Sequence, residues 1–170
     1  APVPARRSPH PKPHTAPLRA PTGAPASYPA CAPARRAVLT GTGGTDVNAL
    51  WVAGRRLGDR LAVVGAGLVG GMVATLLRTF PLARLQLVDL DPERRHLADK
   101  LGVGFAHPDD AKSDCDIVFH CSASQEGLER SLQLAGYEGE IIEMSWSANR
   151  TVTLPLGADF HARRLPLRAS

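Results

Sequence analysis

The sequence predicts an α/β fold built on a doubly wound parallel sheet. Short apolar runs of strand length alternate with longer stretches in which apolar residues recur at helical spacing. One apolar run, at 61–64, passes through a glycine-rich turn into such a stretch, and a second run, at 85–88, ends on an acidic residue. Strands that alternate with helices need right-handed crossovers, which make the strands parallel in one sheet.

Each expected element rests on its own pattern. Pro92 suits the first turn of a helix and Gly102 suits its end. The run 116–121 is apolar nearly throughout, as a buried parallel strand should be. The expected strands are 61–64, 85–88, 103–106, 116–121 and 140–144, then two late strands at 151–154 and 165–168. The expected helices are 45–53, capped by Thr45 or Asp46 after a loop at 41–46, then 68–79, 92–101 and 125–134.

Composition and charge indicate one ordinary domain with a separate tail. The chain has 170 residues, 44% of them hydrophobic, which suffices for a sizeable core. Its net charge of +4 is uneven, because residues 1–36 hold six basic side chains and no acid, while the rest carries a net −2. The domain at 37–170 therefore has no excess of basic residues, and we expect no nucleic-acid binding.

The tail at 1–36 contains ten of the fifteen prolines, so we expect it to be disordered. A transit peptide, a polyproline ligand and translation of a damaged coding region are alternatives for this segment. No apolar run approaches the roughly 20 residues of a membrane span, and no secretory signal is evident. Three cysteines without a CxxC pair argue against a disulfide framework and favour a cytoplasmic setting.

The glycine turn is the most informative motif. Gly65 permits a tight turn off the strand, Gly67 lets backbone approach a pyrophosphate, and Gly70 lets the helix pack against the sheet. Asp89, at the end of the second strand, lies where an acid would accept hydrogen bonds from an adenosine ribose. Together they predict a Rossmann-type dinucleotide site, and a glycine turn of some other α/β fold is the alternative.

The order of the pieces resembles the cofactor domain of the medium-chain dehydrogenase/reductase family, the zinc-type alcohol dehydrogenases and their relatives. The resemblance covers about 37–170. It is carried by Arg-Leu-Gly-Asp-Arg-Leu-Ala-Val-Val-Gly-Ala-Gly-Leu-Val-Gly (56–70), Val-Asp-Leu-Asp-Pro-Glu-Arg-Arg (88–95), Asp-Ile-Val-Phe-His-Cys-Ser-Ala-Ser (116–124), Gly-Glu-Ile-Ile-Glu-Met-Ser-Trp (139–146) and Val-Thr-Leu-Pro-Leu-Gly (152–157).

The resemblance implies a cofactor site. It places the pyrophosphate on the turn formed by Gly65, Ala66, Gly67, Leu68, Val69 and Gly70. Asp89 would bind the adenosine ribose and favour NAD, because its carboxylate repels the 2′-phosphate of NADP. Arg94 matches a basic position near that ribose and would soften this preference, so NADP stays an alternative. Ser122 and Ala123 would lie near the nicotinamide half, unless they serve close packing only.

The resemblance also implies a catalytic zinc domain before the cofactor domain, and this chain shows no counterpart of it. We expect no zinc site, because His10, His14 and Cys31 have no zinc-ligand spacing. His120 is expected to be a packed or hydrogen-bonded core histidine, and His107 and His161 are unpromising as ligands. Both ends of the chain look truncated relative to the family, and we expect no dehydrogenase turnover by the chain alone.

The leading hypothesis is thus an NAD(P)-binding domain of an alcohol dehydrogenase-like oxidoreductase, without a recognisable catalytic residue of its own. The alternatives are a non-catalytic nucleotide-binding or dimerisation module and a methyltransferase, whose sheet also begins with a glycine turn. Val152–Leu156 resembles the dimer-forming strand of the family, which implies a homodimer through the late edge strands. Pro166 removes a ladder donor and suits only an edge or the start of a strand.

Overall fold

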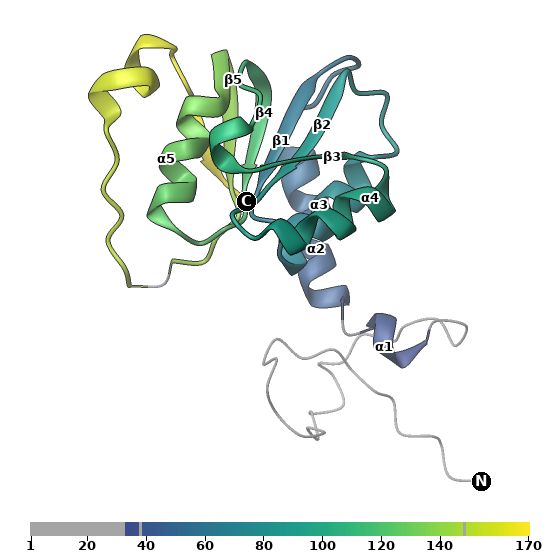
Figure 1. The fold of residues 1–170 in the computed structure, drawn as a ribbon. Helices are drawn as coiled ribbons and strands as arrows, with labels where there is room; N and C mark the ends of the chain where they lie inside the picture. Colours follow the sequence, from purple (N-terminus) through teal and green to yellow (C-terminus); the bar gives the residue numbers. More distant parts are fainter. Residues whose placement is uncertain (1–32, 38, 148) are drawn as a thin grey trace, which may run out of the picture. The chain divides into compact units, whose positions relative to one another are not determined.

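A computed structural model describes residues 33–37, 39–147 and 149–170 (Figure 1). The predicted disorder of 1–32, with the candidate ligands His10, His14 and Cys31, lies outside the described residues. The chain divides into two compact units, Ala1–Gly44 and Thr45–Ser170. The described part of the first unit contains helix α1 (Ala34–Ala37), where the sequence predicts irregular structure, and the start of α2 (Thr40–Val52).

The second unit contains one parallel sheet with the strand order β3-β2-β1-β4-β5-β6. This order reverses between β1 and β4, which is the doubly wound arrangement, so the predicted fold class is confirmed. The strands are β1 (Arg60–Val64), β2 (Arg84–Val88), β3 (Gly104–Ala106), β4 (Cys115–His120), β5 (Ala135–Glu143) and β6 (Leu167–Ala169).

Helices cover both faces of the sheet. Helices α3 (Leu68–Leu77) and α4 (Arg95–Leu101) lie on one face, and α5 (Gln125–Leu134) lies on the other (Figure 1). Alternate residues of β1 accordingly point into two different core clusters, because successive side chains of a strand face opposite sides. Three short helical segments lie between these elements: η1 (Pro92–Arg94) before α4, η2 (Pro108–Asp110) before β4 and η3 (Leu156–Phe160) before β6. No helix within the described ranges is both long and apolar enough to cross a bilayer.

Helix α2 begins earlier than the sequence predicts. The expected loop at 41–46 is helical, and the helix runs from Thr40 to Val52. Glycine weakens a helix by about 1 kcal/mol per residue but retains its N–H donor. Gly43 uses that donor, at 2.7 Å from the carbonyl oxygen of Leu39. Asp46 is therefore an interior helical residue and not the cap.

The late strands also differ from expectation. The segment 151–154 is irregular, because Val152 and Leu154 pack against the core on the α5 face. The edge of β5 pairs instead with β6. Because β6 begins one residue after Pro166, this proline lies at the start of a strand, where its missing N–H donor is tolerated. The homodimer through late edge strands stays a prediction, and β6, the last strand in the order, is now the edge that would form it.

Asp46 is buried without a hydrogen-bond partner for either carboxylate oxygen among the described residues. Burial raises its pKa from 3.8 to about 6. The folded chain therefore binds this proton more tightly than the unfolded chain does. The resulting stabilisation is complete at low pH and is lost as the pH rises towards about 6.

We expect Asp46→Asn to raise the free energy of unfolding near pH 7.5 by about 1–2 kcal/mol, because it removes a buried, unpaired charge. Near pH 4, where the carboxyl is protonated, the gain should be small. Thermal unfolding at both pH values measures this, with Asp99→Asn, a change of an exposed side chain on α4, as the control. An equal effect at both pH values would contradict the assignment.

Candidate functional site

The glycine turn after β1 depends on two close backbone approaches. Gly65 has a φ of +100°, and its N–H donates to the carbonyl oxygen of Val88 at 2.8 Å. A Cβ on Gly65 would lie 2.7 Å from the backbone nitrogen of Ser122. A Cβ on Gly70 would lie 1.9 Å from the carbonyl oxygen of Gly65. The turn thus packs on the end of β4, and α3 packs on the turn.

Gly67 leaves the start of α3 open. Its backbone is extended, no side chain caps the helix, and a Cβ there would meet nothing within 4 Å. The first turn of α3 contains no acidic residue. Leu68 is exposed and Val69 is half-buried at this end. Backbone N–H groups without a side-chain cap, next to open space, form an environment that favours an anion.

Asp89 connects the end of β2 to this turn. Its Oδ2 accepts a hydrogen bond from the N–H of Ala66 at 2.6 Å, and its Oδ1 accepts one from the N–H of Asp91 at 2.9 Å. The carboxylate therefore lies beside the glycine turn at the carboxyl edge of the sheet. In such sheets, ligands bind outside the carboxyl ends of the strands.

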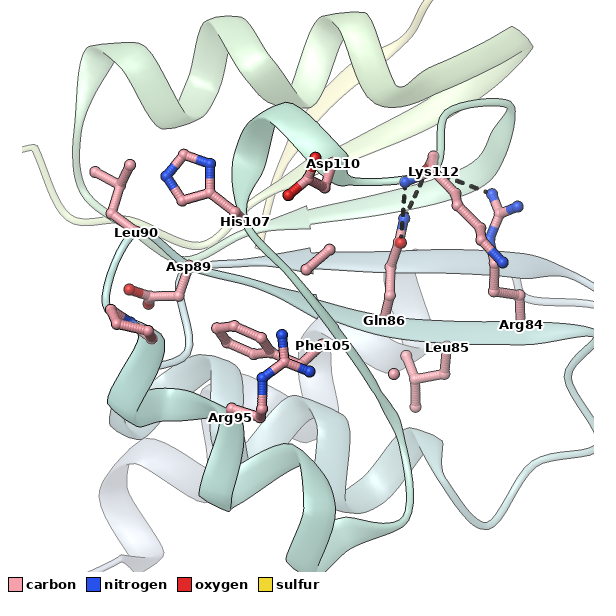
Figure 2. A pocket seen from close by; sticks show the side chains of 13 residues that line it. Arg84, Leu85, Gln86, Asp89, Leu90, Arg95, Phe105, His107, Asp110 and Lys112 are labelled. Atoms are coloured by element: carbon pink, nitrogen blue, oxygen red, sulfur yellow. Dashed lines mark hydrogen bonds between the residues drawn. The ribbon is translucent and has the colours of Figure 1, made fainter.

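A cavity of about 360 Å³ lies beside β2 and β3 (Figure 2). Asp89, Leu90 and His107 line one end of it, and Arg84 and Lys112 lie at the other end. Leu90 is largely exposed, so its apolar side chain is free to pack against a flat ring of a ligand. The acid, the apolar side chain and the imidazole together can bind a sugar hydroxyl next to an aromatic ring.

Arg94 lies outside this cavity. Its guanidinium pairs with Asp91 at 3.3 Å, whereas the next residue, Arg95, lines the cavity and stacks over the ring of Phe105 at 4.9 Å. Sequence reasoning missed Leu90, Arg95 and His107 as lining residues. Leu90 and His107 could have been identified by their position just after β2 and β3, and Arg95 by its place at the start of α4.

The end of β4 lies against the glycine turn. Ser122 follows this strand and contacts Gly65, and Ala123 adopts a left-handed backbone with a φ of +54°. The N–H of Ala123 donates to Ser145 Oγ at 3.0 Å, which holds this turn in place. The structure therefore places Gly65, Ser122 and Asp89 at one edge, as the sequence predicts.

His120 is buried and hydrogen-bonded, as predicted. Its Nδ1 lies 2.7 Å from Glu143 Oε2, and its Nε2 lies 2.8 Å from Ser122 Oγ. Burial alone would raise the pKa of Glu143, but the hydrogen bond and charge of His120 and the hydrogen bonds from Ser145 outweigh it and lower that pKa. Glu143 is thus an ionised partner, which no sequence pattern had indicated.

The described cysteines have no evident chemical role. Burial raises the pKa of Cys115 and of Cys121, so both thiols are protonated and poorly nucleophilic. Among the described residues, no group of three or more His, Cys, Asp or Glu side chains is arranged to hold a metal ion. The expectation of no zinc site stays a prediction.

No family model matches the sequence, and no curated protein matches it. Solved structures do match. L-idonate 5-dehydrogenase from Escherichia coli K-12 is 19% identical with a TM-score of 0.76, over 88% of this chain and 45% of its own. Acetophenone reductase from Geotrichum candidum, solved with NAD, is 19% identical with a TM-score of 0.73, over 85% of this chain and 43% of its own.

An alcohol dehydrogenase from Thermus sp. ATN1 is 21% identical with a TM-score of 0.72, over 84% of this chain and 44% of its own. The chain thus spans less than half the length of these structures. Other similar structures were solved with NADH or NADP. The likeness establishes the fold: this chain has the fold of one part of the alcohol and polyol dehydrogenases, as the resemblance in sequence implied.

Proposed function

We propose that this chain is the NAD-binding part of a zinc-type alcohol dehydrogenase-like oxidoreductase, which transfers hydride between an alcohol and a nicotinamide dinucleotide. One observation carries the proposal: the open backbone at Gly67 and the carboxylate of Asp89 lie side by side at the carboxyl edge of the sheet. A dinucleotide carries both a pyrophosphate, which needs an anion site, and a ribose, whose hydroxyls need an acceptor.

The residues present suit the cofactor. The turn from Gly65 to Gly70, with Ala66, Leu68 and Val69, would bind the pyrophosphate. Asp89 would accept the hydroxyls of the adenosine ribose, and the cavity at Leu90 and His107 has room for the adenine. The nicotinamide half would then lie towards Ser122 and Ala123. When bound, the nicotinamide supplies hydride acceptance, and the chain supplies position and charge.

NAD is preferred over NADP on electrostatic grounds. A carboxylate at position 89 repels a 2′-phosphate, and Asp91 adds a second negative charge nearby. Arg94 is held by Asp91, which reduces its ability to offset that repulsion. Arg95 lines the cavity and is the cation better placed to accept a phosphate. NADP therefore stays the weaker ligand in this proposal.

Calorimetric titration of the full chain with NAD, NADP and S-adenosylmethionine tests this function. We expect NAD to bind with the highest affinity of the three. Asp89→Ala should lower the affinity for NAD at least tenfold, because the ribose acceptor is lost. It should also reduce the difference in affinity between NAD and NADP, because the charge that repels the 2′-phosphate is removed. Asp99→Ala, an exposed change on α4, is the matched control. Tight S-adenosylmethionine binding, or NAD binding unchanged by Asp89→Ala, would overturn the proposal.

A non-catalytic nucleotide-binding module remains the second candidate, because the open backbone at Gly67 and the carboxylate of Asp89 would serve such a module equally well. The two candidates share NAD binding and differ in turnover. NADH formation after a secondary alcohol is added to the NAD-bound chain would exclude the non-catalytic module. We expect no turnover by the chain alone. The cytoplasmic setting and the homodimer are part of the same proposal, and size-exclusion chromatography tests the latter.

A further inference from the structure

Trp146 presents a large aromatic side chain to solvent just after the end of β5. Its side chain is 87% exposed, the highest value among the large apolar residues in the described part of the chain. An aromatic side chain of this kind can bury about 150–250 Å² against a partner. Trp146 therefore offers a large, flat apolar area at the carboxyl edge of the sheet.

The carboxyl ends of four neighbouring strands lie in one row, in the order β2, β1, β4 and β5 (Figure 1). Val64, the last residue of β1, pairs with Val88 of β2 and with His120 of β4. His120 pairs in turn with Glu143, the last residue of β5. Because neighbouring strands lie about 4.8 Å apart, β2 and β5 are about 14 Å apart. The segments that follow these four strands are therefore arranged in series along one edge.

The residues of the proposed cofactor site follow this row in order. Asp89 comes after β2, the glycine turn comes after β1, and Ser122 and Ala123 come after β4. Trp146 comes next in the series, three residues after the end of β5. In the proposed function, the adenosine lies at Asp89 and the pyrophosphate at the glycine turn, so the rest of the dinucleotide extends towards β4 and β5. Its nicotinamide end is then the part that reaches Trp146.

Trp146 is not the only exposed apolar side chain along this edge. Leu90, just after β2, and Leu68, at the start of α3, are also exposed. A single exposed apolar side chain needs no explanation, whereas several that are arranged together mark a binding surface. These three lie along the same row as the open backbone at Gly67. The arrangement indicates an extended ligand that carries flat rings as well as an anionic centre.

The backbone next to Trp146 is held in place by the ends of β4 and β5. The N–H of Ser145 donates to Glu143 Oε1 at 2.6 Å. Ser145 Oγ accepts a hydrogen bond from the N–H of Ala123 at 3.0 Å. The residue before Trp146 is thus tied to the turn that follows β4. A ligand that contacts the indole there has little backbone to order, which lowers the entropic cost of binding.

We propose that the indole of Trp146 packs against the nicotinamide ring of a dinucleotide bound at this edge. The inference rests on the proposed function and names the side chain that contacts the nicotinamide end. The oxidised ring carries a positive charge, and the electron-rich face of an indole attracts a cation. The reduced ring is neutral and lacks this attraction. Trp146 therefore favours the oxidised cofactor over the reduced one.

Fluorescence of single-tryptophan variants of the full chain tests the contact without turnover. The chain has two tryptophans, so Trp51→Phe leaves only Trp146, and Trp146→Phe leaves only Trp51, which is 75% exposed on α2. We expect saturating NAD to quench most of the Trp146 emission, because a pyridinium ring in contact accepts an electron from the excited indole. ADP-ribose, which lacks the nicotinamide, should bind and leave most of this emission. The emission of Trp51 should respond to neither ligand.

Calorimetric titration of Trp146→Leu measures what the contact contributes to affinity. We expect the affinity for NAD to fall about fivefold, because the attraction between the indole and the charged ring is lost. The affinity for NADH should fall less, and that for ADP-ribose should stay within about twofold. Trp51→Leu makes the same substitution at another exposed tryptophan, and it should leave all three affinities unchanged.

The outcomes distinguish a failure of the contact from a failure of the proposed function. If NAD binds but quenches Trp146 no more than ADP-ribose does, the contact is wrong and the proposed function stands. A Trp146 that packs on another protein instead would give this result. Equal losses of affinity for NAD and ADP-ribose in Trp146→Leu would also overturn the contact, because the nicotinamide would not be involved. If neither NAD nor ADP-ribose binds, the proposed function fails and the contact fails with it.

Discussion

Gly70→Ala is expected to destabilise the chain by about 3 kcal/mol or more, because overpacking against backbone cannot be relieved by a change of rotamer. The added Cβ would lie 1.9 Å from the carbonyl oxygen of Gly65 and 3.2 Å from the Cγ1 of Val63. That carbonyl belongs to the left-handed turn that also packs on Ser122. To admit the methyl group, α3 would have to move away from β1, the central strand of the sheet.

Urea unfolding followed by circular dichroism measures this effect. Gly71→Ala is the matched control, one residue along the same helix. Its Cβ would meet only the flexible end of Leu97, at 3.0 Å, and alanine gains about 1 kcal/mol of helix propensity over glycine. We therefore expect Gly71→Ala to leave the free energy of unfolding nearly unchanged. Equal stabilities for the two variants would show that α3 packs differently on the turn.

The two glycines illustrate how far the sequence alone could lead. The order of strand, glycine turn, helix and acid is local, because each part follows the previous one within a few residues. Local patterns predict the fold class, β1, α3 and the place of Asp89 beside the turn, and the structure agrees on each. The assigned role of Gly70 in close packing likewise follows from a local motif and is visible as contact with Gly65.

The errors arise where tertiary contacts decide the local structure. Val152 and Leu154 alternate as a strand would, yet they pack against the core on the α5 face, and β6 takes the edge of β5. The glycines of α2 predict a loop, yet burial of Ala49 and Leu50 stabilises the helix that contains them. Neither the free edge of the sheet nor the buried face of the helix can be predicted from a short stretch of sequence, because both depend on tertiary contacts.

The site divides in the same way. Asp89 was predicted from its distance to the glycine turn. The pair of His120 with Glu143 was not, because 23 residues separate them and only the parallel register of β4 and β5 brings them opposite each other. His120 was expected in the core for the correct reason, its place in a buried strand, but its partner depends on sheet order.

Gly67→Asp is expected to weaken NAD binding at least a hundredfold, about 3 kcal/mol, while leaving the chain as stable as before or slightly more stable. Gly67 is the N-cap of α3, where aspartate is among the best capping residues and can contribute up to about 1 kcal/mol. A Cβ at this position meets no atom within 4 Å, so the folded chain accepts the side chain.

The same carboxylate would occupy the space proposed for the pyrophosphate and repel it. Gly67→Asn separates the two causes, because asparagine has the same shape and caps equally well but carries no charge. We expect Asn to weaken NAD binding about tenfold by its bulk, and Asp to weaken it further by its charge. Calorimetry and urea unfolding on the same samples give both quantities. Undiminished NAD binding in a stable Gly67→Asp variant would mean that no phosphate lies at the start of α3, whereas its loss together with an unchanged unfolding curve would locate the anion there.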